Sequence, residues 1–337
     1  MSILDPELYT GNIIKSRVRL ARNLSNYPFR IEDVKTAREI VTHVNRAIVK
    51  CDTFNLYFMS NLSATALEAM KERHLISTSL IENRERGAAL INKDESVSVM
   101  VNEEDVIREQ CFMRGLRLKE AYERLIKIDD EICKYLPVAY DKKLGYLTAC
   151  PTNLGTGLRA SVMLFLPALT KSGKINALAE EASRLGLTVR GVYGEGSGTD
   201  GAIYQISNEV TLGVSEEEIL QAVEDRVVQI CEVERKESER LFVRNELKTM
   251  DMAKKSYGVL TNAVMLSYSE FLSHVANVKL GAMLGMITIN DISAIDDLII
   301  SSRPANICEQ FGKRLNANDR DLYRAELVGN KLSKLKE

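Results

Sequence analysis

The stretch CPTNLGTGLRASV, residues 150–162, places a thiol, a hydroxyl-rich turn, two glycines and an arginine within thirteen positions. Gly155 and Gly157 allow the backbone to approach a ligand closely or to adopt a positive φ. Arg159 carries a planar guanidinium whose donors match phosphate oxygens. Taken alone, the stretch also fits a plain glycine turn with a buried cysteine and a surface arginine. Its function therefore depends on the other motifs of the chain.

The composition describes a globular protein with a large core. The 337 residues are 45% hydrophobic and 27% charged, enough for one large domain or two of ordinary size. The net charge of −2 indicates no general basic field, so we expect neither nucleic acid nor a membrane as partner. Six scattered cysteines without a CxxC pair, and no signal peptide, predict free thiols in the cytoplasm. Three isolated histidines argue against histidine triads and zinc, and no metal site is predicted.

Upstream, the segment SRVRLAR, residues 16–22, reads as a strand with two distinct faces. Arg17 and Arg19 would project to one face, and Val18 and Leu20 to the other. Two cations side by side repel each other unless an anion joins them. A solvated strand edge is the alternative interpretation.

Three consecutive carboxylates follow an apolar strand in the segment NEEDVIR, residues 102–108. Burying Glu103, Glu104 and Asp105 without partners would be costly. A solvated acidic turn is one interpretation. The other is a grip on a cation, and a guanidinium is the cation whose geometry suits two carboxylates.

The glycine-rich segment GEGSGTDG, residues 194–201, contains a GxGxxG pattern. It continues into a strand-like segment at 202–212, whereas a dinucleotide fingerprint must open a helix. A protein-kinase glycine loop would need a lysine on the next strand and HRD and DFG sequences, which the chain lacks. We interpret the segment as a mobile loop that carries the carboxylate of Glu195, with an ordinary hairpin loop as the alternative.

Periodicity places strands and helices in the first two thirds of the chain and helices alone after about residue 213. Strands are predicted at 16–22, 87–91, 96–101, 187–192 and 202–212, with a further strand-like run at 144–149. Helices are predicted at 34–50, 64–74, 114–136, 175–185, 216–248, 267–278, 289–299 and 320–335. In the last helix, Arg320 and Arg324 share a face and could clamp an anion, although a surface salt-bridge face is the plainer interpretation.

The motifs SRVRLAR, VNEEDVIR, CPTNLGTGLRA and RGVYGEG, in this order, resemble those of the phosphagen (ATP:guanido) kinase family, and most closely its bacterial protein-arginine kinase branch. The segment RDLYRA, residues 320–325, is similar to the phosphoarginine-binding motif of that branch. The resemblance implies an α+β fold in which an antiparallel sheet flanked by helices, of the phosphagen-kinase and glutamine-synthetase type, forms a catalytic domain at 1–250. An all-helical domain for dimerisation and phosphoarginine binding would follow at 251–337.

The resemblance also implies a role for each charged motif, with ATP and Mg²⁺ as cofactors. The residues implied to bind the ATP phosphates are Arg17, Arg19, Arg108, Arg159 and Arg190. Those implied to act on the acceptor guanidinium are Glu104, Glu195 and the thiol of Cys150, with Glu104 accepting the proton. Those implied to bind phosphoarginine as an allosteric ligand are Arg320, Asp321 and Arg324. Val106 and Met163 stand where many relatives have histidine, and we expect them to alter the packing of the nucleotide.

Small-molecule kinases of the family carry a helical domain before the RVR segment, and only sixteen residues precede Arg17 here. We therefore expect a cytoplasmic ATP-dependent protein arginine kinase that marks proteins for Clp-type proteolysis in stress responses. The expected partners are proteins with exposed arginines, a zinc-binding activator of the McsA type, the Clp protease machinery and further copies of the chain in a homodimer or larger assembly. A small-molecule guanidino kinase and an inactive phosphoarginine reader are the alternatives.

Overall fold

A computed structural model describes residues 11–192 and 200–335. An eight-stranded antiparallel sheet runs through it in the order β2-β3-β4-β5-β1-β8-β10-β9. Its strands are β1 (Ile13–Arg22), β2 (Phe54–Phe58), β3 (Ala88–Asn92), β4 (Val97–Val101), β5 (Ile107–Arg114), β8 (Leu158–Phe165), β9 (Leu187–Gly191) and β10 (Ile203–Asn208). Two short strands, β6 (Tyr140–Asp141) and β7 (Gly145–Tyr146), form a separate hairpin. The predicted antiparallel sheet is confirmed, and β1 lies at its middle.

One face of the sheet is covered by helices that bury the main hydrophobic core. These are α1 (Val34–Ile48), α4 (Leu118–Tyr135), α6 (Ile175–Arg184) and α7 (Glu216–Leu241). Val18 and Leu20 of β1 point into this core and are fully buried. The apolar stripe of α1, which includes Ile40, Val44 and Ile48, packs against the same core, as its helical spacing predicts.

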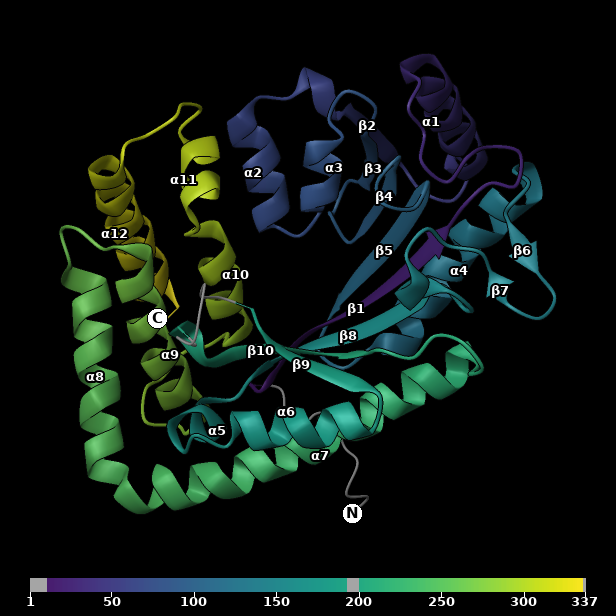
Figure 1. Ribbon diagram of the computed structural model, residues 1–337. Helices are drawn as coiled ribbons and strands as arrows, with labels where there is room; N and C mark the ends of the chain where they lie inside the picture. The colour runs from purple at the N-terminus through teal and green to yellow at the C-terminus, as the bar shows by residue number, and fades with distance from the viewer. Residues whose placement is uncertain (1–10, 193–199, 336–337) are drawn as a thin grey trace.

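Among the described residues, helices cover the opposite face of the sheet at its two ends (Figure 1). Helices α2 (Ala64–Glu72) and α3 (Thr78–Glu82) pack over β3 and β4. The C-terminal helices pack over the far ends of β8 and β10 through Met163, Phe165 and Ile203. They are α8 (Glu246–Asn262), α9 (Tyr268–Met283), α10 (Ser293–Ser301), α11 (Pro304–Gln310) and α12 (Ala317–Lys334). The short helix α5 (Pro167–Lys171) follows β8 and packs against α7. Between these two groups of helices, the surface of β5, β1 and β8 carries polar side chains.

Several sequence predictions of secondary structure were wrong in their boundaries. β5 was missed, because its buried Glu109 and Gln110 interrupt the apolar alternation, and the helix expected from residue 114 begins at Leu118. The helix expected at 216–248 ends at Leu241, and a short turn leads to α8. The run at 144–149 forms only the two residues of β7. The domain boundary expected between residues 250 and 251 falls inside α8, and the division stays a prediction.

The helix-covered face also buries charge beneath β1 and β5. Arg22 donates through Nε and Nη2 to the two oxygens of Asp129, at 2.9 and 2.8 Å, and its guanidinium lies 3.5 Å from the centre of the Tyr146 ring. Glu109 is fully buried beside this pair. Burial, and then the charge of Asp129, raise the pKa of the Glu109 carboxyl well above its usual range.

We predict that Glu109→Gln stabilises the fold at neutral pH. A carboxyl whose pKa is raised in the folded state contributes stability below the unfolded pKa of about 4.3, and this contribution is lost as the pH rises, at about 1.4 kcal/mol per unit of pKa difference. The neutral amide avoids this loss. Urea unfolding at pH 5 and pH 8 should show a gain that is larger at pH 8. The exposed control Glu123→Gln should show none, and a Glu109→Gln variant less stable than wild type at pH 8 would contradict the prediction.

Candidate active site

The alternation of β1 places Arg17 and Arg19 together on the face that the main core does not cover. Val18 and Leu20 occupy the buried face, so the predicted division of this strand is confirmed. Arg19 lies opposite Arg159 in the pairing of β1 with β8. Arg108 of β5 lies opposite Ala21, which shares the face of Arg17 and Arg19. Four arginines from three neighbouring strands therefore meet on one surface.

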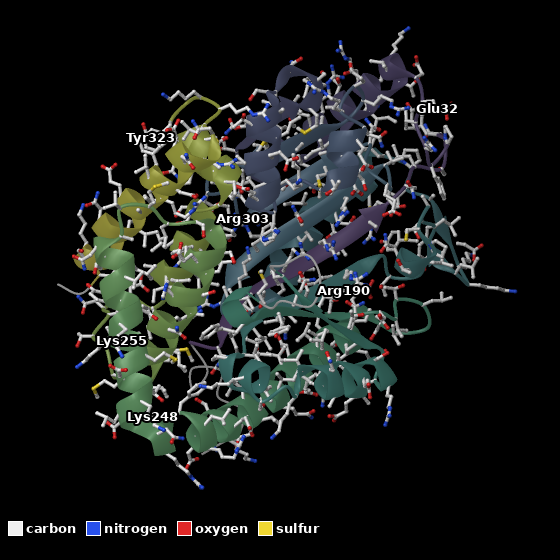
Figure 2. The ribbon with its side chains drawn as sticks, turned by 60° about the vertical axis from the view of Figure 1, so that its left-hand side comes forward. Glu32, Arg190, Lys248, Lys255, Arg303 and Tyr323 are labelled. Carbon is white, nitrogen blue, oxygen red and sulfur yellow. The ribbon has the colours of Figure 1, made fainter. Side chains whose placement is uncertain are left out.

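Arg190 reaches the same face from the edge strand β9. It pairs with Gln205 of β10, and the Gln205 amide oxygen accepts a hydrogen bond from Arg17 Nη2 at 3.0 Å. The Arg190 side chain is exposed, and Figure 2 labels it on this edge strand. The five predicted phosphate-binding arginines thus share one face, although their separation in the sequence exceeds 170 positions. We call Arg17, Arg19, Arg108, Arg159 and Arg190 the arginine face.

The positive charge of this face is only partly balanced. Burial, and then the charges of Arg108 and Arg159, lower the pKa of Arg17 to about 9. Burial and the charge of Arg17 likewise lower the pKa of Arg19 well below its usual range. Within the described residues, the buried Nε atoms of Arg19 and Arg159 have no hydrogen-bond partner. Because unpaired buried cations are costly, this face is suited to bind a polyanion.

A tight acidic turn adjoins the arginine face. Asn102 begins it with φ of 62°, and its N–H donates to the Val106 carbonyl at 2.8 Å. The Glu103 carboxylate is buried and accepts from Arg108 Nη1 at 2.7 Å and from the N–H of Glu104 at 2.8 Å. The Glu104 side chain is exposed. The sequence pointed to Glu104 and missed Glu103, which the structure identifies as the partner of Arg108.

A cavity of about 110 Å³ joins the arginine face, the acidic turn and the glycine stretch. Its polar lining comes from Arg19, Glu104, Arg108, Cys150, Thr152, Asn153 and Arg159. The Cys150 thiol is half-buried and lies 3.0 Å from the hydroxyl of Thr152. Gly157, with φ of 64°, is needed at the cavity wall because a Cβ there would meet the Ala21 carbonyl at 2.6 Å.

Asp105 fixes the acidic turn to the segment that carries Cys150. One carboxylate oxygen accepts from the Ala149 N–H at 2.6 Å and from Asn23 Nδ2 at 2.8 Å, and the other accepts from Asn153 Nδ2 at 2.9 Å. Val106 is buried, and its N–H donates to Asn23 Oδ1 at 2.8 Å. In the sequence, Asp105 stands out only as a member of an acidic run, and no pattern marks Asn23 or Asn153.

A second cavity, of about 400 Å³, lies beyond Arg17 along β1. It is lined on the sheet side by Lys15, Leu75 and Phe112, and on the helix side by residues of α10 and α11 that include Ile300, Ser301 and Asn306. Burial, and then the charge of Arg17, lower the pKa of Lys15 to about 8. Lys15 lies opposite Met163 in the β1–β8 pairing. The segments that line this cavity are far apart in the sequence. They come together only in the folded chain, so no sequence pattern predicted the cavity.

The remaining predicted residues are placed differently. Glu195 lies in the segment 193–199, outside the described residues. Arg324 is buried, and it donates to the carbonyls of Ser302 and Leu266 at 2.8 and 2.7 Å and to Asp321 at 2.6 Å. These bonds from Arg324 hold the C-terminal helices together, so its guanidinium is engaged within the protein in this structure. A phosphoarginine-binding role for these residues stays a prediction.

Residues 11–192 and 200–335 contain no group of three or more His, Cys, Asp or Glu side chains that could hold a metal ion. Over the same ranges, no helix has the length and apolar character needed to cross a membrane.

Two family models match the chain. The model described as ATP:guanido phosphotransferase, C-terminal catalytic domain, matches residues 35–237. The model described as protein-arginine kinase McsB C-terminal domain matches residues 244–337. The chain is 41% identical to a protein-arginine kinase of Caldanaerobacter subterraneus subsp. tengcongensis, over 96% of this chain and 97% of the relative. It is 42% identical to one of Clostridium kluyveri, over 96% of this chain and 95% of the relative.

Solved structures share the fold at lower identity. The duplicated taurocyamine kinase of Schistosoma mansoni superposes with a TM-score of 0.62 at 24% identity, over 80% of this chain and 40% of that one. A lombricine kinase superposes with a TM-score of 0.58 at 24% identity, over 69% of this chain and 70% of that one. From the two family models and the relatives above 40% identity, we conclude that the chain belongs to the ATP:guanido phosphotransferase family, with a C-terminal domain of the protein-arginine kinase type.

Proposed function

We propose that this chain is an ATP-dependent protein arginine kinase, which transfers the γ-phosphoryl group of ATP to arginine guanidinium groups in proteins. The observation that carries the proposal is the cavity in which Arg19, Arg108 and Arg159 meet the exposed carboxylate of Glu104. The unbalanced cations suit a polyphosphate donor, and the carboxylate next to them suits a cationic acceptor, so the two substrates would bind side by side. Family membership and the naming of the relatives as protein-arginine kinases support the proposal.

The arginine face would hold the triphosphate. Phosphoryl transfer depends on positioning and on neutralising the charge that shifts to the leaving phosphate oxygens. Arginines that are fixed on a rigid sheet before ATP arrives need no reorganisation during the reaction. Mg²⁺ would enter with the nucleotide, held mainly by phosphate oxygens and water, since that ion requires few protein ligands. The base and ribose would extend past Lys15 and Met163 into the larger cavity between β1, β5 and α10.

The acceptor would bind next to Glu104. An arginine side chain is protonated in water, with a pKa above about 12, and must lose a proton as its nitrogen attacks. In the proposed step, that nitrogen forms a bond to the γ-phosphorus while the bond from phosphorus to the ADP oxygen breaks, and Glu104 accepts the proton. Cys150 lines the same cavity and would contact the acceptor without attacking phosphorus. Glu195 would supply a second carboxylate from the segment 193–199.

The alternatives are less well supported. A phosphoarginine reader without catalysis has no use for Glu104 beside Arg19, Arg108 and Arg159, and these groups are all in place. A kinase for free guanidino compounds would use the same chemistry, but the relatives at about 41% identity carry the name protein-arginine kinase. Comparing phosphate incorporation into free arginine and into an arginine-rich protein separates the two activities.

The wider biological role forms part of the proposal. We propose that the modified proteins are marked for Clp-type proteolysis in the cytoplasm during stress, and that an activator of the McsA type assists the kinase. Self-association into a dimer or larger assembly would use the C-terminal helices. The exposure of Leu247, Val264 and Met265, at 80%, 78% and 47%, supports an apolar contact there.

Glu104→Gln is predicted to lower kcat by roughly 10²- to 10⁴-fold, because the amide cannot accept the proton. ATP affinity should change little, since the Glu104 carboxylate forms no hydrogen bond or ion pair with the arginine face among the described residues. Phosphoarginine is measured by mass spectrometry without acid treatment, because P–N bonds are labile in acid. Wild-type turnover in this variant would show that another group removes the proton.

Arg19→Gln is predicted to raise the thermal stability of the nucleotide-free protein while weakening ATP binding. The change removes a partly buried cation that its arginine neighbours repel, and such residues at functional sites cost stability. Calorimetry without ATP should show a higher midpoint, and titration with ATP should show an affinity loss of about 10-fold or more, the amount expected from one charge-assisted contact. The exposed control Arg46→Gln should change neither quantity. A lower midpoint with unchanged ATP affinity would contradict both parts.

A further inference from the structure

The C-terminal helices contact the catalytic sheet at the end of α2. The buried carboxylate of Glu72 accepts from the N–H groups of Ala305 and Asn306, at 3.0 and 2.9 Å, and from Asn306 Nδ2 at 3.0 Å. The next residue, Arg73, donates to Asn306 Oδ1 at 2.9 Å and forms an ion pair with Glu309. Figure 1 shows α2 beside α11, and Figure 2 labels Arg303, which directly precedes α11. We call the contacts of Glu72 and Arg73 with α11 the α2–α11 clamp.

The chain that leaves this clamp is attached to the sheet by its backbone. The carbonyls of His74 and Leu75 accept from Gln110 Nε2 of β5 at 2.8 and 3.0 Å. The Leu75 carbonyl also accepts from Ser98 Oγ of β4 at 2.7 Å. His74 adopts φ of 65°, which is uncommon for a residue other than glycine and persists only where the surroundings impose it. A shift of Glu72 and Arg73 would therefore be passed along this segment.

The segment ends at the acidic turn of the proposed active site. Ser77 caps α3 by accepting from the Leu80 N–H at 3.1 Å, and its hydroxyl donates to Glu103 at 2.5 Å. Glu103 in turn holds the guanidinium of Arg108 and the N–H of Glu104. Six consecutive residues, 72–77, thus connect α11 at one end to a phosphate-binding arginine and the proposed base at the other.

We infer that residues 72–77 are a positioning element through which the C-terminal helices set the placement of Arg108 and Glu104. With the α2–α11 clamp closed, Ser77 keeps Glu103 in place. With the clamp released, Ser77 withdraws and Arg108 loses its fixed orientation. The inference rests on the proposed function for its effect on catalysis, but the mechanical link itself does not.

A ligand bound in the larger cavity would contact the α2–α11 clamp, and through it residues 72–77. Its lining includes Arg73, Asn306 and Glu309 of the clamp together with Lys15 on the sheet. A nucleotide whose base occupies the cavity would contact both sides of the clamp. Such a ligand favours the closed state by the difference in its affinity for the two states.

The test uses Glu72→Gln in the full chain, with Glu68→Gln as the matched control. Glu68 lies one turn earlier on α2 and, among the described residues, forms an ion pair with Lys71 alone. Hydrogen exchange is measured for the segments 303–309, 72–77 and 102–108, together with kcat and KM for ATP. Glu72→Gln should raise exchange in all three segments and lower kcat roughly three- to tenfold, a range typical of such couplings. Glu68→Gln should leave all of these unchanged.

A double-mutant cycle with Ser77→Ala separates positioning from plain stabilisation of the interface. If the effect of Glu72 passes through Ser77, the loss in kcat for the double variant is smaller than the product of the single losses. Exchange that rises only in 303–309, with 102–108 and kcat as in wild type, would overturn the inference. If Glu72→Gln does not fold, Asn306→Ala, which removes one donor to Glu72, replaces it. Because exchange requires no turnover, absence of arginine kinase activity in wild type would refute the proposed function alone.

Discussion

Mutual repulsion among arginines on one face of the sheet is the constraint on which the rest of the site depends. Arg17, Arg19 and Arg159 lie partly buried beside one another, and burial together with like charge lowers the pKa of each. A folded chain keeps such an arrangement only if the surrounding structure is rigid and the charges serve a ligand. The eight-stranded sheet provides the rigidity, because β1, β5 and β8 are paired on both sides.

The opposite face of the same strands shows how that arrangement is stabilised. Val18 and Leu20 alternate with Arg17 and Arg19 and anchor β1 in a core covered by α1, α4 and α7. Arg22, at the end of the strand, is itself buried, but Asp129 satisfies it with two hydrogen bonds. Arginines of one strand therefore have opposite functions. Arg22 has a fixed protein partner, whereas Arg19 lacks one among the described residues and is available to a ligand.

The polar turns around the cavity depend on buried carboxylates rather than on the exposed one. Asp105 holds the Cys150 segment, and Glu103 holds Arg108 and the backbone of Glu104. Glu104 itself remains exposed and free of such structural bonds on its carboxylate in the described contacts. This division leaves the group proposed for proton transfer available to the acceptor. The link from Ser77 to Glu103 extends the same network toward the C-terminal helices.

The sequence by itself determined the order of the motifs, the two faces of β1 and the helical character of the C-terminal third. These properties are local, since they follow from a period of two or 3.6 residues and from residue type. Only the tertiary structure decided that Glu103 pairs with Arg108, that Asp105 binds the Cys150 segment, that Arg324 is buried, and that Glu72 meets α11. Each of these is a contact between segments brought together by chain folding. A buried polar side chain that is satisfied by a distant partner leaves no periodic pattern. The strand β5 was missed because its buried polar residues, Glu109 and Gln110, interrupt the apolar alternation.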